Sequence, residues 1–153
     1  MKPPSARRDS NRAIGWASLA AGAGTGLILG LWSFDGPVAV PAWLGDYTDT
    51  ARRLARLGHI ALFGLGILNL LLARELERSS LGAGGRRAAS FLMNLGNIGL
   101  PLALFAAAAW RPCKYLLPIP ALGVFFSVAL AALGARSASF RVPDDGNDPS
   151  GSA

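Results

Sequence analysis

The chain has 153 residues, of which 52% are hydrophobic and only 16% are charged. A soluble domain carries about 25% charged residues, so this composition excludes an ordinary soluble fold and predicts an integral membrane protein. The net charge of +6 does not indicate nucleic-acid binding. The basic residues stand at the ends of apolar segments, where a membrane protein needs them for orientation, and no nucleic acid is expected as a partner.

Four apolar segments, three of them without a charged residue, predict an all-α membrane protein with four transmembrane helices in an antiparallel bundle. Each has about the 20 residues that a helix needs to cross a bilayer. The expected spans are 14–32, 54–73, 88–110 and 115–135, which together make a transmembrane domain over 14–135. The polar flanks, residues 1–13 and 136–153, are predicted to be disordered cytoplasmic tails. A cleaved signal peptide within residues 1–42 is the alternative for the first segment, although that segment's apolar stretch is longer than signal peptides use.

The distribution of basic residues predicts that both termini lie in the cytoplasm. Ten of the 15 Lys and Arg residues fall in the two tails and in the loop between the second and third spans. Cytoplasmic segments carry the excess of basic residues, so the expected orientation is N-in and C-in, in the plasma (inner) membrane. The Trp and Tyr residues agree, because five of the six lie near the predicted outer boundary: Trp32, Trp43, Tyr47, Trp110 and Tyr115.

Small residues recur every four positions along the first span. Lipid tails are as apolar as leucine, so helices in a membrane associate through close backbone approach or interhelical hydrogen bonds. The recurring residues form a predicted helix-packing stripe made of Ser18, Gly22, Gly26 and Gly30. Ordinary packing explains such a stripe better than the lining of a pore.

Three asparagines lie inside the second and third spans, namely Asn69, Asn94 and Asn97. Because the two helices run antiparallel, Asn69 is expected level with the other two at 1.5 Å per residue. An amide without a partner in hydrocarbon costs several kcal/mol, which predicts that the three face one another as an interhelical polar seam. The lining of a ligand or ion path is the alternative.

His59, the single histidine, is the sharpest candidate for a ligand site. Arg52 and Arg56 precede it by about two turns and one turn of helix. This trio could hold a haem with its propionates, a quinone headgroup or an anionic lipid. No second histidine exists to complete a bis-histidine haem site, so haem or quinone is not the favoured interpretation. Hydrogen bonding to another helix is the structural alternative.

These observations favour a non-enzymatic membrane subunit or accessory protein. It would act through helix contacts with itself, as a homo-oligomer, or with a larger membrane complex, surrounded by membrane lipid. No catalytic residue and no metal site is predicted, because zinc needs three or four ligands and the chain has one Cys and one His. Two alternatives stay open: a haem- or quinone-binding electron-transfer module centred on His59, and a small homo-oligomeric transporter.

Overall fold

The computed structural model describes residues 6–33, 36–46 and 49–139, and this part of the chain contains helices and no strand. The elements are α1 (Ala6–Leu31), α2 (Thr50–Arg78), α3 (Ala83–Ala109), the short 3-10 helix η1 (Arg111–Leu116) and α4 (Pro118–Ser139). Four segments, counting η1 with α4, are long and apolar enough to cross a membrane. The predictions of an all-helical fold and of four candidate spans are confirmed.

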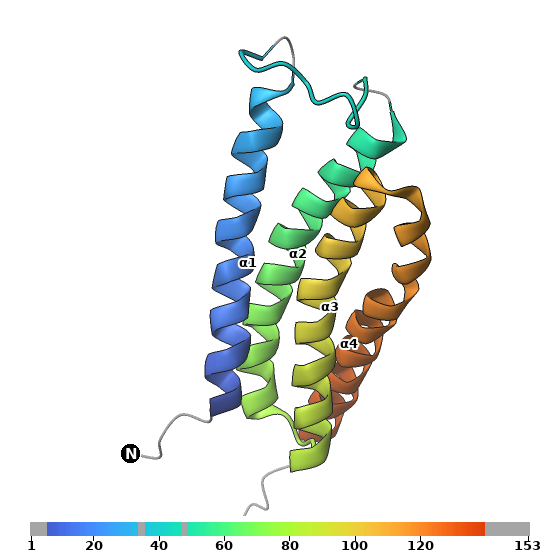
Figure 1. Cartoon of the computed structure of the whole chain (residues 1–153). Coiled ribbons are helices and arrows are strands. Elements are labelled where there is room, and N and C mark those ends of the chain that lie inside the picture. The colour runs from blue at the N-terminus through green and yellow to red at the C-terminus, as the bar shows by residue number, and fades with distance from the viewer. Residues whose placement is uncertain (1–5, 34–35, 47–48, 140–153) are drawn as a thin grey trace, which may run out of the picture.

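Consecutive helices run in opposite directions and pack side by side in chain order (Figure 1). Helix α2 packs against α1 along its length and against α3 on its other side, and α4 packs against α3. Helices α1 and α3 meet over a shorter contact, and α1 makes no contact with α4 among the described residues. One face of α1 therefore has no helix beside it.

Glycines mark the places where helix axes approach most closely. A Cβ atom built on Gly15 of α1 would lie 3.0 Å from the backbone oxygen of Gly66 on α2, and one built on Gly66 would lie 3.0 Å from that of Gly15. At the α3–α4 contact, a Cβ on Gly123 would lie 3.1 Å from the backbone oxygen of Leu92. These contacts leave no space for a side chain, as expected for helix association without a hydrophobic driving force.

The distribution of side chains is the reverse of that in a soluble protein. Large apolar side chains such as Ile60, Phe91 and Leu102 point outward and are at least 60% exposed. The fully buried side chains include Asn11, Asn69 and Asn97, which are polar. An exposed apolar surface of this extent requires an apolar surrounding, which is consistent with a membrane protein.

The helices extend beyond the predicted spans at the end of the bundle that holds the start of α1 and the end of α4. Helix α1 begins at Ala6, so residues 6–13 of the predicted tail are helical, and Asn11 within them is only 1% exposed. Helix α4 continues to Ser139, while the rest of the predicted C-terminal tail, 140–153, lies outside the described residues. The difference arises because charge limits the length of a span in hydrocarbon, whereas a helix can continue past the bilayer edge.

Candidate functional site

A hydrogen-bonded network of amides links three helices near the end of the bundle where α1 begins and α2 ends. Asn11 Nδ2 on α1 donates to Asn69 Oδ1 on α2 at 2.6 Å, and Asn69 Nδ2 donates to Asn94 Oδ1 on α3 at 2.9 Å. Ser90 on α3 donates its hydroxyl to Asn11 Oδ1. We call these four residues the asparagine seam. Asn69 and Asn94 meet as the sequence suggested, but the third asparagine of the seam is Asn11 and not Asn97.

Asn97 lies away from this seam and bonds to α1 instead. Ser18 Oγ is 2.9 Å from Asn97 Oδ1 and 3.0 Å from the backbone oxygen of Leu62. A hydroxyl has one hydrogen, so Ser18 can give a full hydrogen bond to only one of these two acceptors at a time. Asn97 Nδ2 is buried and has no partner among the described residues. The Asn97 amide therefore has more hydrogen-bonding capacity than the surrounding helices use.

Asn97 lines an open groove between α1 and α3. The groove encloses about 390 Å³, and α2 supplies its floor through Leu62. Its remaining walls are mainly apolar and include Ile14, Ala17, Ala21, Leu102 and Phe105. An apolar groove with a few polar groups has the general character of a binding site. The groove lies beside the Ser18–Asn97 contact, because both of these residues line it.

His59 contacts α1 at the α1–α2 interface. Its Nδ1 is 3.3 Å from Thr25 Oγ1, and the Thr25 hydroxyl donates to the Gly22 backbone oxygen at 3.0 Å. Since that donation uses the hydroxyl hydrogen, the consistent arrangement has Nδ1–H donating to Thr25. A Cβ on Gly26 would lie 2.6 Å from His59 Cε1 and 3.3 Å from Nε2, so this edge of the ring packs on the α1 backbone. The ring also makes an edge-to-face contact with Phe63 at 5.3 Å between centroids.

Arg52 of the predicted ligand trio has a different partner on the chain from His59. Arg52 is buried, and its guanidinium donates to the Trp32 backbone oxygen, where α1 ends. Arg56 is half-buried, and both arginines have further interactions. The bond from Arg52 to Trp32 connects the start of α2 to the residue that follows α1. Of the three residues, none lines the groove beside Asn97.

The predicted helix-packing stripe divides between two environments. Ser18, Gly22 and Gly26 face α2, where a Cβ on Gly22 would lie 3.0 Å from the Phe63 ring. Gly30 is exposed, and a Cβ there would meet nothing within 4 Å. The stripe thus lies against α2 over three of its four residues.

Asn11 is the functional candidate that sequence reasoning missed. The sequence offers one signal for it: Asn11 precedes Ser18 by seven residues, so both lie on the same helix face if the helix begins before residue 11. Among the described residues, no three His, Cys, Asp or Glu side chains are grouped so that they could hold a metal ion. Comparisons with protein-family models, with curated proteins and with solved structures found no match to this chain.

Proposed function

We propose that this chain is a non-enzymatic, multi-pass subunit of the plasma membrane that acts through helix–helix contact along the α1–α3 groove. The observation that carries the proposal is the buried Asn97 amide group without a partner at an otherwise apolar groove. An acyl chain could fill the groove but could not bond to Asn97. An unpaired amide N–H costs free energy in hydrocarbon, which favours an occupant that can accept a hydrogen bond from Asn97.

The unpartnered face of α1 supports a helix as the occupant. This face carries the exposed small residues Ala13, Ala17, Ala20 and Gly24, spaced by four, three and four positions. A Cβ built on Gly24 would meet nothing within 4 Å, so no described residue covers the face at this position. Small residues let a second backbone approach closely, and a backbone carbonyl of that helix would accept a hydrogen bond from the buried Asn97 amide once that side chain turns toward the groove.

The occupant that we propose is α1 of a second copy. Every copy presents the same small face, and a two-fold axis would place each α1 beside the groove of the other copy. A symmetric pair of this kind needs no further component. It also agrees with the excess of small residues on α1, which a lipid or a small molecule would not require.

Site-specific photo-crosslinking between two differently tagged copies tests this function. A benzophenone amino acid replacing Ala17, at the groove, should give an adduct that carries both tags, and one replacing Leu122 on the exposed face of α4 should not. Ala21→Leu, which fills the groove, should remove the adduct, while Ala132→Leu on α4 should leave it intact. Lipid adducts alone at Ala17 would overturn the proposal. An adduct with a different protein would overturn the second copy as the occupant and would indicate a subunit of a larger complex.

A quinone is the second candidate occupant, and the size of the groove favours it. About 390 Å³ is within the range of small-molecule sites, and the Asn97 amide could donate to a quinone carbonyl. This position differs from the His59-centred site that the sequence suggested. Extraction of the purified protein with organic solvent, followed by ultraviolet absorbance and mass spectrometry, would detect a stoichiometric quinone. A loss of that quinone in the Asn97→Leu variant would favour this candidate over the helix.

A further inference from the structure

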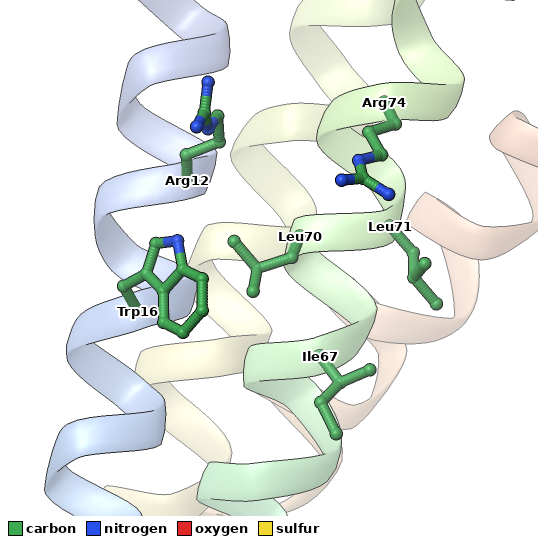
Figure 2. A pocket seen from close by; sticks show the side chains of 6 residues that line it. All are labelled: Arg12, Trp16, Ile67, Leu70, Leu71 and Arg74. Carbon is green, nitrogen blue, oxygen red and sulfur yellow. The ribbon is translucent and has the colours of Figure 1, made fainter.

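A second pocket lies between α1 and α2, at the end of the molecule where α1 begins and α2 ends. It encloses about 310 Å³ and is lined by Arg12, Trp16, Ile67, Leu70, Leu71 and Arg74. Figure 2 shows the two arginines at one end of this pocket and the apolar side chains at the other. The pocket is separate from the groove, because the two share no lining residue.

The two arginines come from different helices and present like charges to one pocket. Both are exposed, and neither guanidinium group has a hydrogen bond or an ion pair within the described part of the chain. Glu75, which adjoins Arg74 in sequence, does not line the pocket. Two guanidinium groups without a carboxylate between them favour an anion, and their planar donors suit phosphate oxygens.

The apolar part of the pocket continues into the outer surface of the helices. Trp16 is 62% exposed, Leu71 is 55% exposed and Ile67 is 50% exposed. Tryptophan is enriched at the boundary between headgroups and hydrocarbon, so Trp16 indicates the level of that boundary. Arg12 lies one turn before Trp16 on α1, on the headgroup side of this level. A molecule that fits both halves has an anionic head and an apolar chain.

We propose that this pocket binds an anionic phospholipid, with the headgroup phosphate between Arg12 and Arg74. One acyl chain would lie over Trp16, Leu71 and Ile67. A free phosphate ion would use the arginines but would leave the exposed apolar surface uncovered. The site is at the end of the helices predicted to face the cytoplasm, where anionic lipids attract basic residues. The lipid would join α1 to α2, and the proposal does not depend on what occupies the groove.

Native mass spectrometry of the full chain in detergent, with added phosphatidylglycerol or phosphatidylcholine, tests this site. The wild-type protein should retain phosphatidylglycerol in preference to phosphatidylcholine. Replacing both arginines, Arg12→Gln with Arg74→Gln, should weaken retention about tenfold or more, because two charge-assisted contacts are lost. The matched control, Arg53→Gln with Arg87→Gln, removes two exposed arginines outside the pocket and should stay within about twofold of wild type, as expected for charges far from the lipid.

Three results would overturn the proposal. The first is equal retention of the two lipids by the wild-type protein. The second is equal loss in the pocket and control variants, which would show a general effect of net charge. The third is full competition by millimolar inorganic phosphate, which would show that the arginines bind phosphate without the acyl chain. Helical content, measured by circular dichroism on each variant, separates loss of the lipid from loss of the fold.

Discussion

Replacing Asn69 by leucine tests the asparagine seam most directly, because Asn69 is its central residue. The side chain accepts one hydrogen bond from Asn11 and donates another to Asn94. Leucine has nearly the same volume and can make neither bond. The change therefore removes both interhelical bonds with little change in packing, and it leaves an amide donor on α1 and an amide acceptor on α3 without their partner.

The expected loss of stability follows from the two bonds. Interhelical hydrogen bonds in membranes average about 0.6 kcal/mol and reach about 1.7 kcal/mol, so Asn69→Leu should cost about 1 to 3 kcal/mol. Steric trapping of the protein in bicelles measures this free energy of unfolding without removing the lipid. A double-mutant cycle with Asn11→Leu should show coupling of about 0.6 kcal/mol or more, because each single change removes the same bond.

Asn97 provides the matched control for this cycle. It bonds to Ser18 and shares no hydrogen-bond partner with Asn69. Combining Asn97→Leu with Asn69→Leu should therefore give additive losses, within about 0.5 kcal/mol. Additivity between Asn11 and Asn69 would refute the seam. If the coupling energy of Asn69 with Asn97 equals its coupling energy with Asn11, the Asn11–Asn69 hydrogen bond makes no specific contribution to the seam.

Three further predictions concern packing and topology. Gly26→Ala should destabilise the α1–α2 contact, because the added Cβ would lie 2.6 Å from His59 Cε1. In the same unfolding assay, Gly30→Ala should be neutral, and His59→Ala should restore the stability lost in Gly26→Ala. Ser127→Ala should cost about 1 kcal/mol, because the buried hydroxyl donates to the Ala89 backbone oxygen at 2.7 Å; a loss below about 0.3 kcal/mol would contradict this. Reporter fusions should read outside in the α1–α2 and α3–α4 connections and inside in the α2–α3 connection and at the C-terminus, and an outside signal at the C-terminus would contradict the N-in, C-in orientation.

Sequence alone determined the helical class and the number of candidate spans. An apolar segment of about 20 residues crosses hydrocarbon as a helix, because every backbone N–H and C=O must then bond within its own segment. The contact of Asn69 with Asn94 was also predictable, because the rise per residue places these two residues at the same height on neighbouring antiparallel helices. Local charge and helical rise were sufficient for these inferences.

The tertiary structure decided which polar groups have partners. Asn11 was assigned to a tail because charged residues surround it, and only the packing of α1 on α2 and α3 shows that its amide is buried at the centre of the seam. His59 and Arg52 resembled a ligand site in sequence, but their contacts lie at the α1–α2 interface. The Asn97 amide N–H has no partner because α1 brings only the Ser18 hydroxyl to this side chain, and that hydroxyl lies at the amide oxygen. Sequence periodicity gives the face of each helix, whereas the distance between two helices depends on side chains from both.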